Sequence, residues 1–211
     1  LNTDAITFTG KGNIINSKTI NEKTGGSGLD ITLAGGSLTN TGTVTTVDAL
    51  AFTTLDGDLN NNTGTLTSNT IEMVNGSLTN KATLNANIIT FTGTGGIVNS
   101  MKLLGGNSGM VDITLAGGSL TNSGTMTAVD NLVLIGAGAL NNNAGTFTAS
   151  TIDMVNGTLT NKAALNVTDN ATGLRITGNG SLVNTSALRA GLITLTNGDL
   201  TNSGTGTIAE T

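Results

Sequence analysis

The residues of this chain that could take part in catalysis are its carboxylates and two of its arginines, Arg175 and Arg189. Asp56 and Asp58 are the closest carboxylate pair on one predicted strand face, at i and i+2, and a glycosidase needs two opposed carboxylates. Arg175 and Arg189 could serve a lyase as the base, but no carboxylate cluster accompanies them, and the chain has no His, Tyr or Trp to support either set. We therefore expect no enzyme and no catalytic residues, and a carbohydrate-active enzyme is the less favoured alternative.

The absent residue types exclude further classes of site. Without His or Cys, the ordinary zinc and haem ligand sets cannot form, and the Ca²⁺-binding pattern Gly-Gly-x-Gly-x-Asp occurs once, at residues 25–30, without the tandem repetition that builds a calcium-binding β-helix. With eight Lys+Arg and a formal net charge of −5, the chain lacks the clustered positive charge that nucleic-acid binding requires. We predict no metal site, no cofactor and no nucleic-acid partner.

The overall composition favours a folded chain. Hydrophobic residues make up 36% and charged residues 10%, whereas disordered chains are poor in apolar residues and rich in charge. No apolar run approaches the roughly 20 residues of a membrane span, so we expect no membrane insertion. The sequence shows no signal peptide and no initiator Met, which favours a mature product or an excised piece of a longer protein.

A short repeat runs through the whole chain. The pattern Gly-x-Leu-x-Asn, with Ile replacing Leu in places, ends at ten asparagines spaced 18 to 24 residues apart, which are Asn16, Asn40, Asn61, Asn80, Asn99, Asn122, Asn142, Asn161, Asn184 and Asn202. A longer period is also present, since the segments 31–40 and 113–122 are 82 positions apart and identical. Four short units therefore form a super-repeat.

Each unit has the period of β-strands. In the unit that begins at Gly36, apolar residues alternate with polar ones around Leu38, Val44 and Leu50–Phe52, which predicts three short strands per unit. A unit of this size cannot bury a face alone, so successive units must stack in parallel. We predict one all-β repeat domain over residues 1–211: a parallel, right-handed β-helix of about ten coils, with about 20 residues in each coil. In the last unit Gly206 stands where the second strand should be apolar.

The repeated asparagine has a structural interpretation. Asn tolerates a bend, and its amide can bond to the amide of the Asn one coil away. We therefore predict a ladder of stacked amides formed by the ten asparagines named above, and we assign it no ligand.

Three insertions lengthen the repeat between the second and third strands, at 21–30, 105–112 and 166–173. We expect them to project from the same corner, and loops on one face of a repeat protein often bind partners. Glu22, Lys23, Asn107, Asp169 and Asn170 are the candidate binding residues in these loops. Tolerated surface insertions are the competing interpretation.

Thr-x-Thr pairs offer a second candidate surface. They occur at Thr43/Thr45, Thr65/Thr67, Thr125/Thr127 and Thr146/Thr148. Stacked pairs would make a flat hydroxyl array that resembles the ice-binding faces of β-helical antifreeze proteins. The array is interrupted at Asn85 and Ala164, and Thr is a common outward strand residue, so ice binding is a less favoured alternative.

The units Gly36–Val44 and Gly118–Met126 carry a family resemblance. Their sequences, Gly-Ser-Leu-Thr-Asn-Thr-Gly-Thr-Val and Gly-Ser-Leu-Thr-Asn-Ser-Gly-Thr-Met, resemble the repeats of filamentous haemagglutinin-type adhesins, which are two-partner secretion exoproteins. Related repeats occur in autotransporter passengers. The resemblance extends from Ile6 to about Thr207 and implies a stiff extracellular shaft on a bacterial surface, used for attachment or aggregation.

The expected function follows from this resemblance. We predict a shaft segment of a secreted or cell-surface adhesin, whose partners are a host or bacterial surface protein or glycan. The alternative is a subunit that assembles end to end with copies of itself into an extracellular filament, because uncapped strand edges pair with other chains.

Overall fold

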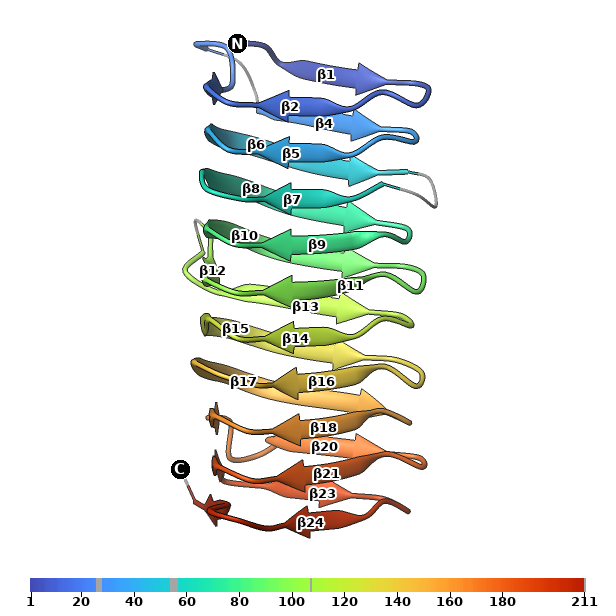
Figure 1. Cartoon of the computed structure of the whole chain (residues 1–211), viewed down its shortest axis with the longest axis vertical. Helices are drawn as coiled ribbons and strands as arrows, with labels where there is room; N and C mark the ends of the chain where they lie inside the picture. Colours follow the sequence, from blue (N-terminus) through green and yellow to red (C-terminus); the bar gives the residue numbers. More distant parts are fainter. Residues whose placement is uncertain (26–27, 54–56, 107, 211) are drawn as a thin grey trace.

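The computed structural model describes residues 1–25, 28–53, 57–106 and 108–210. Within these ranges the chain is all-β and contains no helix, and its strands stack in parallel, coil upon coil, as a β-solenoid (Figure 1). As the chain descends in Figure 1, the near strands point left and the far strands point right. The solenoid is therefore right-handed, as predicted and as parallel crossovers generally are.

One side of the solenoid is a ten-stranded sheet, which we call the front sheet. Each of its strands carries the end of one Gly-x-Leu-x-Asn unit, and ten stacked strands enclose nine complete turns of about 20 residues. In spatial order the strands are β2 (Ile14–Asn16), β5 (Leu38–Asn40), β7 (Leu59–Asn61), β9 (Ser77–Asn80), β11 (Gly96–Asn99), β14 (Leu120–Asn122), β16 (Ala139–Asn142), β18 (Thr158–Asn161), β21 (Ser181–Asn184) and β24 (Leu200–Asn202).

The other strands form a 15-stranded sheet that wraps around the remaining sides of the solenoid. We call its first part, directly after the front sheet, the short face, and its second part the long face. The strands are β1 (Ala5–Phe8), β3 (Thr19–Ile20), β4 (Leu29–Leu33), β6 (Thr43–Phe52), β8 (Thr65–Met73), β10 (Thr83–Phe91), β12 (Lys102–Gly105), β13 (Val111–Leu115), β15 (Thr125–Leu134), β17 (Thr146–Val155), β19 (Ala164–Val167), β20 (Leu174–Thr177), β22 (Ala187–Ala190), β23 (Ile193–Leu195) and β25 (Thr207–Ala209).

The number of strands per coil differs from the sequence expectation. In most coils without a long insertion between short and long face, the predicted second and third strands are one continuous strand, as in β8 and β10, although β22 and β23 are separate without one. The two strands are separate where an insertion intervenes, as in β12 and β13. The difference arises because an extended chain can bend around a corner without losing its ladder bonds to the coils on either side.

The core is the apolar column predicted from the alternating pattern. Leu38, Val44 and Leu50 are fully buried, and the same holds for their equivalents through most of the stack. The end coils are less covered, since Leu200 is 50% exposed and Ile208 is 37% exposed. The expectation that the last unit lacks an apolar residue in its second strand is wrong. Ile208 pairs with Leu188 and takes the apolar position. Gly206 lies instead in the preceding turn, where its N–H donates to the Ser203 carbonyl oxygen.

The repeated glycine is required by close stacking of backbones. A Cβ atom on Gly36 would overlap the carbonyl oxygen of Gly12 in the preceding coil, and a Cβ on Gly118 would overlap that of Gly95. The same approach recurs at the glycine of each following unit. The column of glycines therefore lets the turns before the front sheet lie directly against one another.

Candidate functional site

The ten repeated asparagines lie in one column where the front sheet ends. From Asn16 to Asn202, each side-chain Nδ2 donates to the Oδ1 of the next asparagine, in nine hydrogen bonds of 2.8–3.0 Å. Asn40 to Asn184 are fully buried and Asn16 is 5% exposed. We call this column of side chains the amide ladder, and the turns that follow it the ladder corner.

The amide ladder uses its remaining hydrogen-bonding capacity within the protein. The Nδ2 group of Asn61 also donates to the Thr83 carbonyl at 2.9 Å, and that of Asn80 to the Lys102 carbonyl at 2.8 Å. In the described part of the chain, every buried side-chain nitrogen or oxygen atom has a hydrogen-bond partner. A fully satisfied buried network fixes a structure, so the ladder holds the coils in register and presents no free group to a ligand.

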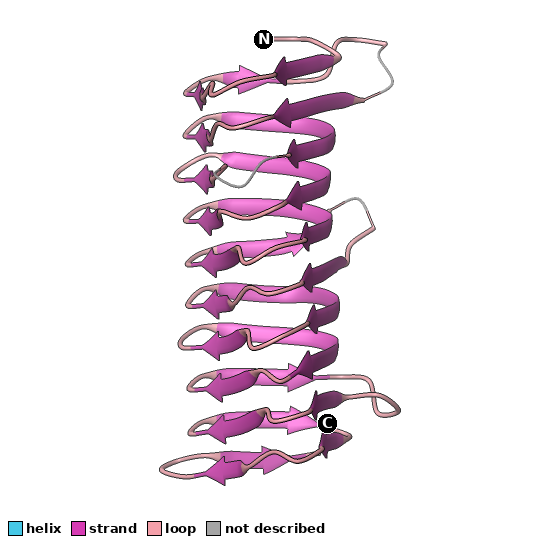
Figure 2. Cartoon of the chain, turned by 90° about the vertical axis from the view of Figure 1, so that its right-hand side faces the viewer, coloured by secondary structure: helices cyan, strands magenta, loops and turns pink. Residues whose placement is uncertain are grey.

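The three insertions project from the same side of the solenoid, between the short face and the long face (Figure 2). We call this side the insertion corner. Glu22 and Lys23 belong to the first insertion, whereas Asp169 and Asn170 belong to the third, between β19 and β20. Asn107, the candidate in the second insertion, lies outside the described residues. The first and third loops are seven coils apart, or about 34 Å at the spacing of parallel strands, so the candidate residues do not form one site.

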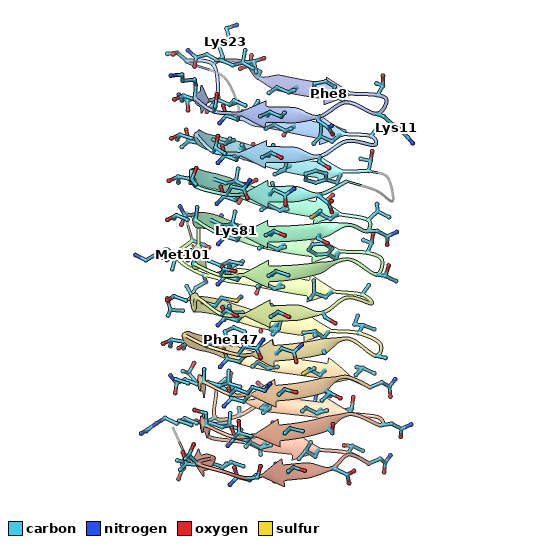
Figure 3. The ribbon with its side chains drawn as sticks, in the orientation of Figure 1. Phe8, Lys11, Lys23, Lys81, Met101 and Phe147 are labelled. Carbon is cyan, nitrogen blue, oxygen red and sulfur yellow. The ribbon has the colours of Figure 1, made fainter. Side chains whose placement is uncertain are left out.

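The described loop residues partly serve their own loops. A Glu22 carboxylate oxygen accepts from the Gly28 N–H at 2.9 Å, while Lys23 projects above the first coil (Figure 3). Asp169 accepts from the N–H groups of Ala171 at 2.7 Å and Thr172 at 2.9 Å. These backbone hydrogen bonds, first that of Thr172 and then that of Ala171, lower the pKa of Asp169.

The Thr-x-Thr pairs stack in two separate runs, and each run spans two neighbouring coils. Thr43 lies in register with Thr65, and Thr125 with Thr146. Between these two runs the column continues with Thr83 and then Lys102. The charged side chain breaks the flat hydroxyl surface that ice binding would need.

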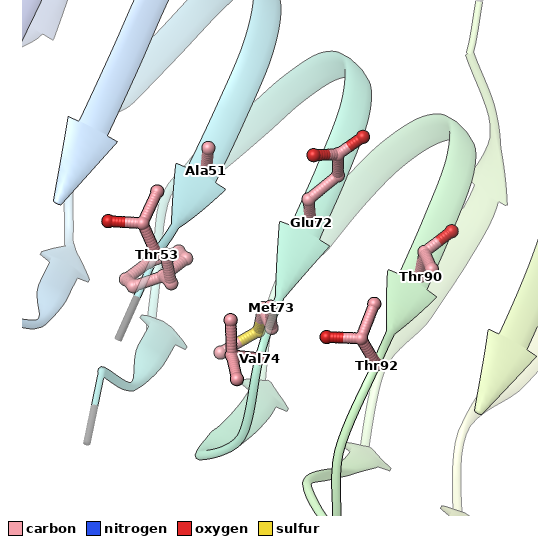
Figure 4. A pocket seen from close by; sticks show the side chains of 8 residues that line it. Ala51, Thr53, Glu72, Met73, Val74, Thr90 and Thr92 are labelled. Carbon is pink, nitrogen blue, oxygen red and sulfur yellow. The ribbon is translucent and has the colours of Figure 1, made fainter. Parts of the chain in front are cut away.

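An open depression of about 290 Å³ lies on the long face between β6 and β10 (Figure 4). Glu72 stands over it in the middle coil, and Thr90 and Thr92 line one side, with Ala51 and Thr53 on the other. The residues that line this depression include one carboxylate, whereas glycoside hydrolysis uses two. The sequence analysis did not identify Glu72 as a site residue. Its neighbours in the depression come from adjacent coils, and they can be identified only when the register between coils is known.

The other candidate charged groups are dispersed. Arg175 on β20 pairs with Asp153 on β17, with its Nε 3.1 Å from Asp153 Oδ1, and this hydrogen bond raises the pKa of Arg175. Arg189 lies on β22, on the short face, so the two arginines do not share a site. Asp58 is described, but Asp56 lies outside the described residues. A search of the described residues finds no group of three or more Asp, Glu, His or Cys able to hold a metal ion.

Among the residues that the structure describes, no helix has the length and apolar character needed to cross a membrane. No protein-family model, curated protein or solved structure matches the chain.

Proposed function

We propose that the chain is a structural and adhesive shaft segment of a secreted or cell-surface bacterial adhesin, which mediates attachment or aggregation. The observation that carries the proposal is the amide ladder, which runs without a break through all ten strands of the front sheet. Together with a continuous buried core, it makes a stiff rod whose elements are held one to the next. The resemblance of its units to filamentous haemagglutinin-type repeats supports the extracellular location and the adhesive use.

The charged groups of the described residues do not form a catalytic set. The depression beside Glu72 offers one carboxylate, and the ion pair Asp153–Arg175 is on the surface, with side chains 29% and 51% exposed. The proposed partners are accordingly surface proteins or glycans of a host or of other bacteria, met by the sides or loops of the rod.

Attachment of coated particles tests this proposal. Beads that carry the folded 211-residue chain should bind bacterial or host cells more than uncoated beads do. Beads that carry the Gly64→Ala variant, whose added Cβ would overlap the Gly42 carbonyl oxygen, should bind less, in step with its loss of β-structure by circular dichroism. Equal binding of coated and uncoated beads would count against an adhesive role.

A filament subunit, in which copies of the chain stack end to end, is the second candidate. Ile6 and Phe8 at one end, and Leu200 and Ile208 at the other, occupy core positions but are only partly covered. A second copy stacked end to end would bury these residues and pair the strand edges of both coils. Sedimentation velocity measures this: oligomers should lengthen with concentration, and a monodisperse monomer well above micromolar concentration would eliminate the filament.

A further inference from the structure

The charges of this acidic chain are segregated around the solenoid. Five of the eight cations lie within five residues after an asparagine of the amide ladder, and none of the 13 carboxylates does. These five residues are Lys18, Lys81, Lys102, Lys162 and Arg189. We call them the cationic edge, because they follow the ladder corner along the axis of the rod.

The members of the cationic edge are exposed and form no ion pair with any carboxylate that the structure describes. All five side chains belong to exposed residues. The ion pair found in the described part of the chain joins Asp153 to Arg175, which lie on the long face. The positive charge of the edge is therefore available to an external anion, although the whole chain has a formal net charge of −5. At physiological salt a ligand senses charges within about 8 Å, so the edge acts locally as a basic surface.

The cations are grouped in pairs of adjacent coils. Lys81 lies two residues before Thr83, which is in register with Lys102 in the next coil, and both lysines line an open depression of about 480 Å³. Lys162 lies 81 positions after Lys81, and Arg189 is in register with Asn166 of the coil that holds Lys162. Lys81 and Lys162 are thus related by the four-coil super-repeat and are about 19 Å apart along the axis, whereas Arg189 lies two positions further along its coil than Lys102 does.

The depression between Lys81 and Lys102 also offers uncharged hydrogen-bonding groups. Asn62, Thr63 and Thr65 line it on one side, and Thr83 lies between the two lysines. Met101 is 51% exposed beside them and projects from the same edge (Figure 3). Hydroxyl and amide groups next to separated cations suit a ligand that carries both anionic groups and many hydroxyls.

The spacing of the cations along the rod indicates which kind of anionic polymer matches the edge in charge density. Five charges over the eight steps between the first and ninth coils amount to one charge per roughly 8 Å of rod. Duplex DNA carries one charge per about 1.7 Å, so most of its phosphates would remain unpaired. A pyranose unit is about as long as one coil is tall, and a glycan with a carboxylate on every second sugar therefore approaches the charge density of the edge.

We infer that the cationic edge binds an extended acidic polysaccharide of the uronate class, lying along the axis of the rod. Each exposed ion pair contributes little by itself, and the edge has no aromatic ring on which sugars could stack. Binding is therefore weak at one pair, strengthened by simultaneous contact with both pairs, and reduced by salt. The inference deepens the proposed adhesive function by naming a ligand class, and it rests on that function for its biological use but not for the binding itself.

The test uses hyaluronan, a polymer with one glucuronate per disaccharide, and the folded full-length chain. Affinity is measured at low and at physiological salt for the wild type, for the double variant Lys81→Gln/Lys162→Gln, and for Lys11→Gln/Lys23→Gln. The last variant loses the same charge away from the edge; Lys11 projects from the opposite side and Lys23 from the first insertion (Figure 3). Circular dichroism confirms that all three proteins are folded.

We expect the Lys81/Lys162 variant to bind hyaluronan about tenfold more weakly at low salt, with less than a twofold change in the control. Binding should fall as salt rises, and neutral dextran should not bind. Equal losses in the two variants, no binding at low salt, or tighter binding of duplex DNA than of hyaluronan at equal anionic charge would each overturn the inference. If coated beads still attach to cells after the Lys81/Lys162 change, the adhesive function stands and its ligand is another one.

Discussion

The ladder corner and the insertion corner turn the same chain through similar bends but follow different rules. At the ladder corner every coil has an asparagine, and the amide hydrogen bonds are buried and continuous. At the insertion corner, a short exposed series joins Asn69, Asn87 and Ser108, with 2.7 Å between Asn87 Nδ2 and Asn69 Oδ1 and 2.8 Å between Ser108 Oγ and Asn87 Oδ1. Water can replace the exposed bonds but not the buried ones.

This difference explains where the long insertions lie. The turns after Asn61 and Asn142 hold one residue more than those after Asn40 and Asn122, since Thr65 pairs with Thr43 and Thr146 with Thr125, yet the ladder is unbroken. The ladder corner therefore takes up single residues, whereas a long insertion at the insertion corner extends a loop in solvent, for which the entropic cost grows slowly with length. The three insertions accordingly occur at the insertion corner (Figure 2).

The largest effect is expected from adding one methyl group at each corner. Gly64→Ala at the ladder corner places a Cβ over the Gly42 carbonyl oxygen, and because that obstacle is backbone, the coils must separate. We expect a loss of about 3 kcal/mol in unfolding free energy, measured by urea denaturation. Gly191→Ala near the third insertion meets the Asn170 side chain, which can rotate away, and should cost well under half as much. Equal losses would contradict the contrast.

Removing one amide from each corner should give the next largest difference. Asn80→Ala takes away the acceptor of Asn61 Nδ2 and the donor to Asn99 Oδ1, both buried. We expect a loss of about 2–3 kcal/mol by the same measurement. Asn87→Ala removes exposed bonds and should stay within about 0.5 kcal/mol of the wild type. A small effect at Asn80 would show that the ladder does not hold the register.

The ion pair beyond the third insertion should matter less. Arg175→Met removes the partner of Asp153, but the two side chains are 51% and 29% exposed, so solvent screens their attraction. We expect a loss of less than about 1 kcal/mol, and this loss should shrink as sodium chloride is added. A loss of unfolding free energy as large as that of Asn80→Ala would show that the ion pair contributes to stability as a buried pair does, which would contradict its assignment as a weak surface contact.

The smallest effect is local and depends on pH. The folded pKa of Asp169 is lowered, so its carboxylate stabilises the third loop at and above the ordinary pKa and loses that effect as pH falls through the folded value. The amide signals of Ala171 and Thr172, followed by NMR, should titrate with a midpoint below 3.8, the ordinary value for Asp169. Asp169→Ala should abolish this titration and leave the global unfolding midpoint unchanged. A midpoint at or above 3.8 would show that these two N–H groups do not hold the carboxylate.

Much of the fold could be predicted because the repeat makes each position occur ten times. The alternation around Leu38, Val44 and Leu50 predicted which side chains enter the core, and these residues are buried. The period of the asparagines predicted parallel stacking. At Gly206 the same reasoning failed, since a turn of unusual length moves Ile208 into the apolar position, and local spacing does not show such a shift.

The candidate sites were harder to predict, because they depend on neighbours in adjacent coils. Glu22 and Asp169 occupy equivalent loops in sequence, yet seven coils separate them in space. The depression beside Glu72 and the cationic edge around Lys81 and Lys102 depend on the pairing of β8, β10 and β12. A sequence alone gives the order of residues along a coil, but the insertions change the number of residues between coils, and hence which side chains become neighbours.

The sequence by itself determined the period, the strand alternation and the residue types that can stack: a small residue before the front sheet, an apolar one inside it and an amide at its end. These are properties of one unit, and they follow from backbone sterics and the hydrophobic effect. Only the tertiary structure decided that the glycines are required by the carbonyl oxygens of the preceding coil, that the amides are buried, and that five of the eight cations follow one corner of the rod. These are relations between units, and they exist only after parallel hydrogen bonding has brought residues about 20 positions apart into contact.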